Sequence, residues 1–489
     1  MRQDQEGIIP SVHQYIRAFF LFLAAAIASS LGENAVARPA IVISDVQILD
    51  FSGEGPAVQP SMSVVIRDGL IEAIGPADAV AIPDGAEVIE GQGRYLMPGM
   101  ADMHVHIWDE ASLGAYLAHG ITTVRNLSGM PVHLRLADRI AEGELAGPRL
   151  LTTGPILNSP GPNAQLNHQM VQTGEDARAA VRTQHAAGYR EIKVYSNLTV
   201  EAWHGARDEA KALGMRISGH SPEGVREPGM PRDKPFNIAF IDLLDDGFTT
   251  IEHVESIVWH GLRNRYDPVA AKALARKIAD SGTAVDPTLV AFHNLLRVAE
   301  TRGEYLNRPG VDMMNPLLVA QEQPQYDRWS SEAIEPNREA FEFYKQVTRL
   351  FADAGVTMVA GSDAGIFTNI PGESLIDELV LLAEAGLAPL EVMRAASFNP
   401  AIVLGEEAMR GRVAAGHVAD LVMLAENPLD DVTAAGKPVL VVAAGRVHDR
   451  AALDAMLDTA RSPVVERTQS NLVEALTAQG IDPATLFGP

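Results

Sequence analysis

Two histidines one residue apart follow an apolar run and a Pro-Gly turn in the stretch YLMPGMADMHVH. The apolar run predicts a buried β-strand, and alternate residues of a strand point to the same face. The imidazoles of His104 and His106 are therefore expected on one face, where two neutral imidazoles can hold a metal ion. An H-x-H pair alone is equally compatible with two core histidines that hydrogen-bond within the protein, so other residues must decide.

A lysine occupies the strand-like segment EIKVYS, between Ile192 and Val194. Burial of an ammonium group on an internal strand is unfavourable without a partner. One resolution is reaction of the neutral Lys193 amine with CO2, which gives a carbamate whose two oxygens can bridge two metal ions. The ordinary alternative is a lysine whose ammonium reaches solvent, but both neighbours on this strand are apolar.

The region 98–404 alternates short apolar runs with helical stretches such as ARAAVRTQHAAG, a pattern typical of parallel βα units. The eight strand candidates are GMADMHVH, GITTVRNL, PRLLTTG, EIKVYS, MRISGHS, TTIEHVE, TAVDPTL and VTMVAGSD. They predict an α/β fold with a (β/α)8 TIM barrel, in which functional residues lie at the carboxyl ends of the strands. His220, His253 and Asp363 end the fifth, sixth and eighth candidates, so we expect them beside His104, His106 and Lys193.

Strand-and-turn patterns flank this region at 38–97 and 405–447 and predict one small β-sandwich domain formed from both chain ends. Residues 448–489 predict a helical tail that serves packing or assembly. A long excursion, 292–353, separates the seventh and eighth strand candidates. It is interpreted either as an active-site lid or as an oligomer contact.

Composition excludes several classes of function. The formal net charge of −24 leaves no basic surface for a nucleic-acid partner. The chain has no cysteine, so disulfides and thiolate metal sites are excluded and any metal must be held by histidine, carboxylate or a modified lysine. Apolar residues make up 47% of the chain, as in ordinary globular proteins.

The N-terminal segment RAFFLFLAAAIASS has Arg17 before an apolar run that is short for a membrane span. NAVA, ending at Ala37, offers a cleavage site of the A-x-A type. The pattern predicts a signal peptide over 1–37, export to the periplasm or exterior of a bacterial cell, and no stable membrane partner after cleavage. An uncleaved membrane anchor is the alternative.

From about residue 40 to 446 the chain resembles the amidohydrolase superfamily. The resemblance rests on YLMPGMADMHVH, HGITTVRNLSG, GPRLLTTG, IKVYS, SGHS, TIEHVES, PTL, AGSD, ASFNPAIVLG and GRVAAGHVADLVML. Lys193, on the fourth strand candidate, makes the chain similar to imidazolonepropionase-related members that bind two metal ions, rather than to mononuclear members of the imidazolonepropionase or deaminase type. The resemblance implies that His104, His106 and Asp363 hold one divalent metal ion, His220 and His253 hold a second, and N6-carboxylated Lys193 bridges both. Zinc is the usual metal, and a β-sandwich accompanies the barrel.

The expected activity is amide hydrolysis. Two metal ions that share a water lower its pKa, and the resulting bridging hydroxide attacks a carbonyl. Asp363 is expected to be catalytic, because a carboxylate there can accept the proton and pass it to the leaving nitrogen. The chain is most similar to Xaa-Pro dipeptidase-like and ochratoxin-hydrolysing members. Xaa-Pro-type dipeptides, N-acyl amino acids and ochratoxin-like aromatic amides are therefore the expected small-molecule substrates.

Substrate contacts are carried over from the resemblance at two positions. Tyr195 stands two residues after the lysine, where related dipeptidases contact a substrate carboxylate. His168 in NSPGPNAQLNHQM is a displaced counterpart of a Gly-Gly-His stretch in relatives. Asn126 stands where an aspartate is common, and PGESLIDELVLLAEAG lacks a histidine that often precedes its Glu-Leu pair. These departures leave the metal core intact but weaken any transfer of specificity.

Two other functions stay open. The same site would suit a hydrolase of a carbamate, urea, lactone or cyclic imide. A non-catalytic periplasmic binding protein is the non-enzymatic alternative, although none of the six ligand positions is lost. A homo-oligomer is expected in either case.

Overall fold

The computed structural model describes residues 39–161, 164–165, 167–225 and 234–483. The predicted signal peptide over 1–37 lies outside the described residues. The described residues from Ala40 onward form one compact unit. No helix in the described part of this unit combines the length and apolar character needed to cross a membrane.

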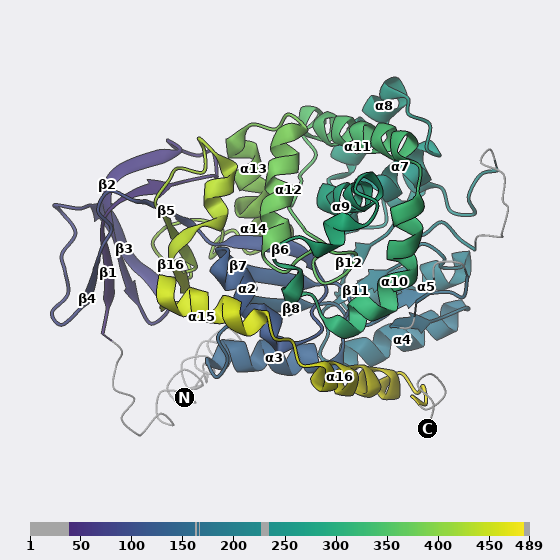
Figure 1. Ribbon diagram of the computed structural model, residues 1–489, viewed down its shortest axis with the longest axis horizontal. Helices are drawn as coiled ribbons and strands as arrows, with labels where there is room; N and C mark the ends of the chain where they lie inside the picture. Colours follow the sequence, from purple (N-terminus) through teal and green to yellow (C-terminus); the bar gives the residue numbers. More distant parts are fainter. Residues whose placement is uncertain (1–38, 162–163, 166, 226–233, 484–489) are drawn as a thin grey trace, which may run out of the picture. The chain divides into compact units, whose positions relative to one another are not determined.

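Strands from both ends of the chain form one sheet (Figure 1). Its strands are β1 (Ile41–Leu49), β2 (Val58–Arg67), β3 (Leu70–Pro76), β4 (Glu87–Glu90), β5 (Tyr95–Pro98), β15 (Leu421–Leu424), β16 (Pro438–Ala443) and β17 (Arg446–Asp449). β5 joins the two groups, because it pairs parallel with β1 and antiparallel with β15. Ile43, Val64, Leu421 and Val442 share one apolar cluster, so strands from both ends enclose a common core, as predicted for the sandwich.

Seven parallel strands form most of the barrel. They are β6 (Met100–Val105), β7 (Ile121–Asn126), β8 (Arg149–Thr152), β11 (Glu191–Val194), β12 (Arg216–Gly219), β13 (Thr250–Glu252) and β14 (Ala284–Asp286). β6, β7 and β8 pair in sequence order, and so do β11, β12, β13 and β14. The two groups meet where the N–H of Gly154, just after β8, donates to the carbonyl of Glu191 at 3.0 Å.

The eighth strand candidate closes the ring without forming a full strand. It is held by isolated parallel bridges, from Val285 to Met358 and from Val105 to Ala364. The N–H of Met103 also donates to the carbonyl of Ala360 at 3.0 Å. This segment therefore lies between β14 and β6, which is the strand order of a (β/α)8 barrel.

The barrel interior contains a buried arginine that links four strands. The guanidinium of Arg125 on β7 donates to the carbonyl of Met103, to Glu191 and Ser218, and to Glu252 on β13. Arg125 is 0% exposed, so its charge requires these acceptors. The network fixes the register of β6, β11, β12 and β13 beneath the candidate ligands.

Helices follow most barrel strands, as βα units require (Figure 1). They are α2 (Leu113–Ala118), α3 (Pro131–Glu142), α4 (Gly174–Ala187), α5 (Val200–Ala212), α6 (Phe240–Leu243), α7 (Val254–Leu262), α8 (Pro268–Ser281), α12 (Glu373–Glu384), α13 (Pro389–Ala396) and α14 (Phe398–Leu404). The residues at the two ends of α4 show why the helix begins and ends where it does. Thr173 and Asp176 form a reciprocal capping box, and Gly188 ends the helix with a φ of 111°.

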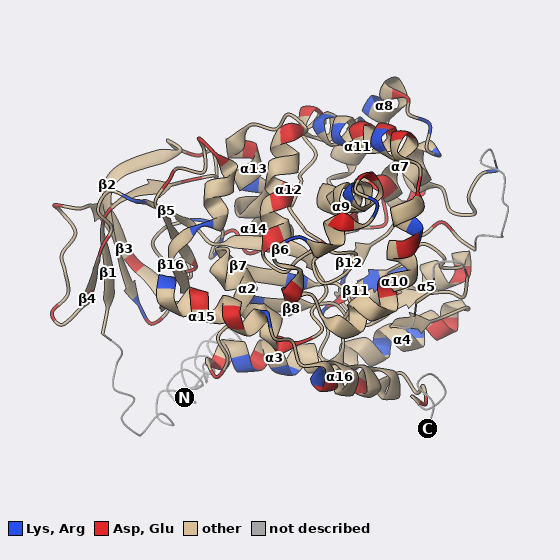
Figure 2. Cartoon of the chain, in the orientation of Figure 1, with Lys and Arg blue, Asp and Glu red and all other residues tan. Residues whose placement is uncertain are grey.

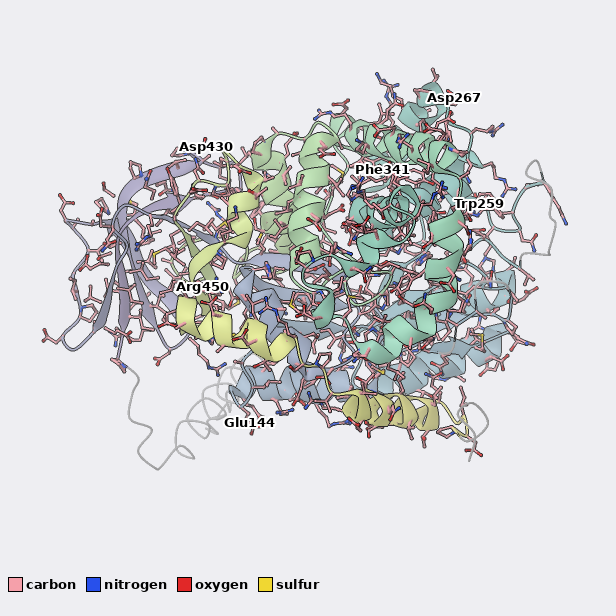
Figure 3. The ribbon with its side chains drawn as sticks, viewed as in Figure 1. Glu144, Trp259, Asp267, Phe341, Asp430 and Arg450 are labelled. Atoms are coloured by element: carbon pink, nitrogen blue, oxygen red, sulfur yellow. The ribbon has the colours of Figure 1, made fainter. Side chains whose placement is uncertain are left out.

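Three segments depart from the simple alternation of strands and helices. The short strands β9 (Ile156–Asn158) and β10 (His168–Met170) continue the sheet beside β11 and were not predicted. The long excursion folds as α9 (Leu289–Glu300), α10 (Pro316–Ser331) and α11 (Ile334–Ala354). The tail forms the expected helices α15 (Arg450–Ala460), which starts at the residue labelled in Figure 3, and α16 (Val465–Ala478).

Charged side chains lie mostly outside this framework. Figure 2 shows acidic and basic residues interspersed along outer helices such as α4 and α11. Acidic residues outnumber basic ones by 63 to 39 in the whole sequence. The absence of a nucleic-acid partner stays a prediction from this composition.

Candidate metal centre

The structure brings the six predicted ligands together at the carboxyl ends of the barrel strands. They are His104 on β6, His106 directly after it, Lys193 on β11, His220 after β12, His253 after β13, and Asp363 in the closing segment. The exposed fractions of His104, Lys193 and Asp363 are 0%, 1% and 4%. Six side chains from five strand ends thus share one largely desolvated location.

Asp363 joins the two histidines of the H-x-H pair. Its Oδ1 lies 2.9 Å from Nε2 of His106 and 3.2 Å from Nε2 of His104. Burial raises the pKa of Asp363, but His104 and the hydrogen bond from His106 outweigh that effect and hold its pKa below the ordinary value. The carboxyl is therefore an anion that points at the same place as both imidazoles.

The amine of Lys193 points into this group and not toward solvent. Its Nζ lies 2.8 Å from Nε2 of His104. Burial lowers the pKa of Lys193 from 10.5 to about 8, which increases the fraction of neutral amine. The alternative of a lysine that reaches solvent is wrong.

His220 and His253 complete the group from the neighbouring strands. Their ring centroids are 4.5 Å apart, and the ring of His253 is 4.8 Å from that of His104. Nδ1 of His220 is buried and has no hydrogen-bond partner among the described residues. An imidazole nitrogen without a hydrogen bond, next to other potential metal ligands, is suited to bind a metal ion.

The electrostatics favour neutral imidazoles. Burial is the main cause of the lowered pKa of His106. Burial is also the main reason that the pKa of His253 is lowered to about 4. Burial also lowers the pKa values of His104 and His220 well below the ordinary value, and neighbouring cationic groups add to the effect. The neutral ring is the form that binds a metal ion.

Within the described part of the chain, two triads of potential ligands have ligand atoms within 4.8 Å of one another. The first is His104, His253 and Asp363, and the second is His104, Glu252 and Asp286. In the second triad, Glu252 already accepts from Arg125 at 3.0 Å and lies 3.1 Å from Nδ1 of His104. Both carboxylate oxygens of Asp286 are buried and have no hydrogen-bond partner among the described residues. The first triad fits a metal ion better, because Glu252 of the second triad already binds Arg125 and supports His104.

Neighbouring side chains fix three of the imidazoles through Nδ1. Glu252 lies 3.1 Å from that atom of His104, Ser128 Oγ lies 2.9 Å from that of His106, and Thr288 Oγ1 lies 2.5 Å from that of His253. Such partners orient an imidazole so that its other nitrogen faces the metal. None of these three supporting residues was predicted from the sequence.

Backbone strain accompanies this arrangement. His253, Thr288 and Asp363 adopt positive φ angles of 67°, 44° and 53°. These conformations are unfavourable for residues with a Cβ, most of all for a β-branched threonine. Each residue follows the end of a barrel strand or of the closing segment. The turns direct His253 and Asp363 into the centre and direct Thr288 to Nδ1 of His253.

A cavity of about 490 Å³ opens over the centre. Apolar side chains form part of its wall: Trp108, Phe292, Leu318 and Leu472, with Ile156, Ala164, Ala291, Leu295, Ile366 and Phe367. The polar or ionisable lining residues besides the candidate ligands are Gln165, Asn167, His168, Tyr195, Glu255, Gln321, Glu322 and Gln325. The excursion and the C-terminal helix both contribute, so distant segments complete the pocket.

Both predicted substrate-contact residues lie in this pocket. The rings of His168 and Tyr195 are 4.7 Å apart, and the ring of Tyr195 is 4.0 Å from that of His220. Asn126 has a structural role instead. Its Oδ1 accepts from the N–H of Ile107 at 2.9 Å, and this bond holds the chain that follows the H-x-H pair.

Known protein families and curated proteins match parts of this chain. The model of the amidohydrolase family matches residues 237–448. An adenine deaminase of Paracoccus denitrificans is 28% identical over 136 residues, which are 25% of this chain and 22% of that protein. The ochratoxinase of Aspergillus niger is 36% identical over 90 residues, 18% of each chain. The chain thus matches less than a quarter of the length of these curated relatives.

Similarity to solved structures extends over most of the chain. A protein of Bifidobacterium longum described as a candidate prolidase is 25% identical, with a TM-score of 0.63 over 87% of this chain and 100% of that one. A Xaa-Pro dipeptidase with bound methionine is 20% identical, with a TM-score of 0.64 over 84% and 100%. The second likeness concerns the fold alone. Residues 237–448 thus match the amidohydrolase family, and the fold over most of the chain is similar to that of these solved structures.

Proposed function

We propose that the chain is a metal-dependent enzyme that hydrolyses a C–N bond, most simply an amide. The observation that carries the proposal is the convergence of four neutral imidazoles, one lysine amine and one carboxylate at the carboxyl ends of the strands. Binding alone would not require a carboxylate that contacts both H-x-H imidazoles beneath a cavity large enough for a small molecule.

The donor set suits two divalent cations, with zinc as the expected metal because imidazole and carboxylate ligands dominate. His104, His106 and Asp363 would hold one cation, and His220 and His253 the other. Lys193 would bridge them after its neutral amine adds CO2, which forms an N–C bond and releases a proton. When bound, the cations would polarise a carbonyl and lower the pKa of a shared water.

The chain's own residues would then bind and orient the substrate and move the proton. Asp363 would accept a proton at a carboxylate oxygen and deliver it to the leaving nitrogen; its contact with Nε2 of His106 supports this role. Tyr195 and His168, which line the pocket, would donate hydrogen bonds to a polar group of the substrate. Trp108, Phe292 and Leu318 would exclude water from the apolar side.

The substrate class is proposed from the pocket and the relatives together. A cavity with one apolar wall and several amide side chains suits a small amide such as an Xaa-Pro dipeptide, an N-acyl amino acid or an ochratoxin-like aromatic amide. The similar proteins include a Xaa-Pro dipeptidase and an ochratoxinase. Because one relative is an adenine deaminase, hydrolysis of a C–N bond other than that of a linear amide is the second candidate function.

The test combines metal analysis with a substrate panel of Xaa-Pro dipeptides, N-acyl amino acids, aromatic amides and cyclic imides. We expect about two metal ions per chain, loss of activity on chelation, and its return with zinc. Lys193→Ala should lose bound metal together with activity. Asp363→Asn should lower kcat by about 10²–10⁴-fold. Full activity of Lys193→Ala would exclude the carbamate bridge, and a metal-free wild type with no activity on the panel would exclude the hydrolase.

A further inference from the structure

One face of α10 forms part of the pocket wall. Leu318, Gln321, Glu322 and Gln325 all line the pocket. Their spacing places them on one side of a helix. Gln321 and Gln325 carry neutral amides, whereas Glu322 carries a carboxyl group. α10 therefore presents one carboxylate to the cavity that contains the candidate ligands.

Two hydrogen bonds fix Glu322, and both use the same oxygen. The hydroxyl of Tyr326 donates to Oε2 at 2.7 Å, and the N–H of Phe367 donates to Oε2 at 2.9 Å. Phe367 belongs to the loop that follows Asp363, so this loop connects Glu322 to the metal centre. Oε1 accepts no hydrogen bond from any described residue, which leaves it available to a ligand.

No basic side chain in the described part of the protein pairs with Glu322. The charge acting on it is that of Asp363, which is repulsive, and burial is the main reason that its pKa is raised to about 7. Lys193 is the sole lysine or arginine among the described lining residues, and it belongs to the candidate metal centre. Glu255 adds a second carboxyl group to the lining. A partly desolvated carboxylate gains most from a cation, and here that cation must come from the ligand.

We propose that Glu322 is a specificity-determining residue that binds the free ammonium group of the substrate while the amide carbonyl lies at the metal centre. The inference rests on the proposed amide hydrolysis and narrows its substrates to aminoacyl compounds with an unblocked amine, such as dipeptides. The acyl part of an N-acyl amino acid carries no ammonium group and leaves Glu322 without a partner. The apolar wall that includes Trp108 and Phe292 would then receive the side chain of the aminoacyl group.

The first test compares L-leucyl-L-proline with N-acetyl-L-leucyl-L-proline at pH 7.5 in the zinc-loaded wild type, Glu322→Gln and Asp327→Asn. Glutamine can keep both hydrogen bonds of Glu322 through its carbonyl oxygen and removes only the charge. Asp327 is an exposed carboxylate on the same helix and serves as the control. We expect Glu322→Gln to lower kcat/KM for the free dipeptide by about ten- to a hundredfold, with little effect on the acetylated one. Asp327→Asn should leave both values unchanged. An equal effect of Glu322→Gln on both substrates, or none on either, would overturn the assignment.

The second test measures binding without turnover, with L-leucinamide as the cationic probe and N-acetyl-L-leucinamide as the neutral one. Calorimetry on the zinc-loaded wild type should show at least about tenfold tighter binding of L-leucinamide, and Glu322→Gln should abolish that preference. If no panel substrate is hydrolysed but this preference depends on Glu322, the hydrolase proposal fails and the ammonium site stands. If wild type and Glu322→Gln bind the two probes alike, the ammonium site is wrong.

Discussion

Thr288 is a single residue that influences the candidate metal centre indirectly, because it contacts the candidate ligand His253. Its Oγ1 lies 2.5 Å from Nδ1 of His253, and its own hydroxyl donates to the carbonyl of Pro287 at 2.9 Å. The hydroxyl therefore accepts from the imidazole and fixes the tautomer in which Nε2 is free to bind a metal. Its positive φ of 44° shows that the turn holds this contact despite a steric penalty.

Thr288→Val should weaken metal binding without unfolding the barrel. Valine has nearly the shape of threonine but cannot accept the hydrogen bond, so His253 loses its orienting partner. We expect zinc affinity to fall by about 10–100-fold, measured by competition with a chromogenic chelator. Thr283→Val, at the opposite end of β14, is the matched control. Equal zinc affinity in both variants would show that His253 is not a ligand or needs no partner.

At the scale of elements, α16 closes one side of the pocket. Asp109, just after β6, accepts from the N–H of Val464 at 2.8 Å and from Arg467. Asn471 donates to the carbonyl of Trp108 at 3.2 Å, and Leu472 packs with Trp108. The tail is thus tied to the loop that follows the H-x-H pair.

Leu472→Ser should raise KM more than it lowers kcat. The serine removes apolar contact from the pocket wall, whereas every candidate metal ligand lies on other elements. We expect kcat/KM to fall by about tenfold, and the fluorescence of Trp108 to shift to longer wavelength as water reaches the wall. Val473→Ser changes the adjacent residue, which is 42% exposed, and should leave both readouts unchanged. If Leu472→Ser and Val473→Ser gave the same kcat/KM and the same fluorescence, a role for α16 in the pocket would be contradicted.

The elements also show how much of the fold could be predicted. The apolar runs between helical stretches predicted seven strands that the structure contains, since each run and its bounding turns are local features. The eighth run, VTMVAGSD, is in its predicted place but forms only isolated bridges. The two β-rich flanks predicted a shared sheet, and β5 joins them through β15.

The candidate site also contains some residues that could be predicted from the sequence and others that could not. His104, Lys193 and Asp363 could be predicted to meet, because parallel strand order alone places their strand ends together. Glu322 and Leu472 could not, because helix packing over the barrel mouth brings them to the pocket from the excursion and the tail. The ligand roles themselves stay predictions until a metal is measured. Export and homo-oligomer formation also stay predictions.

At the scale of the whole molecule, buried carboxyl groups make stability depend on pH. Glu378 on α12 is 0% exposed, and its Oε2 accepts from the N–H of Val290 at 2.7 Å, while its Oε1 is buried without a partner. Burial is the main cause that raises its pKa from 4.5 to about 8. The folded protein therefore keeps this proton over a pH range in which the unfolded chain has released it.

The sign of the resulting pH dependence follows from proton binding. Between pH 4.5 and about 8 the folded state binds more protons at Glu378 than the unfolded state, so raising the pH lowers the free energy of unfolding. This contribution is fully present below pH 4.5 and is lost as the pH rises through 8. In Glu378→Gln the group cannot ionise, so the variant should gain stability relative to wild type between pH 5 and pH 9. We expect a gain of a few kcal/mol, with about 5 kcal/mol as the upper limit, from urea unfolding curves of both proteins. Glu384→Gln, at the exposed end of the same helix, is the control. If the difference in free energy of unfolding between Glu378→Gln and wild type stays constant across this pH range, Glu378 is ionised in the folded protein.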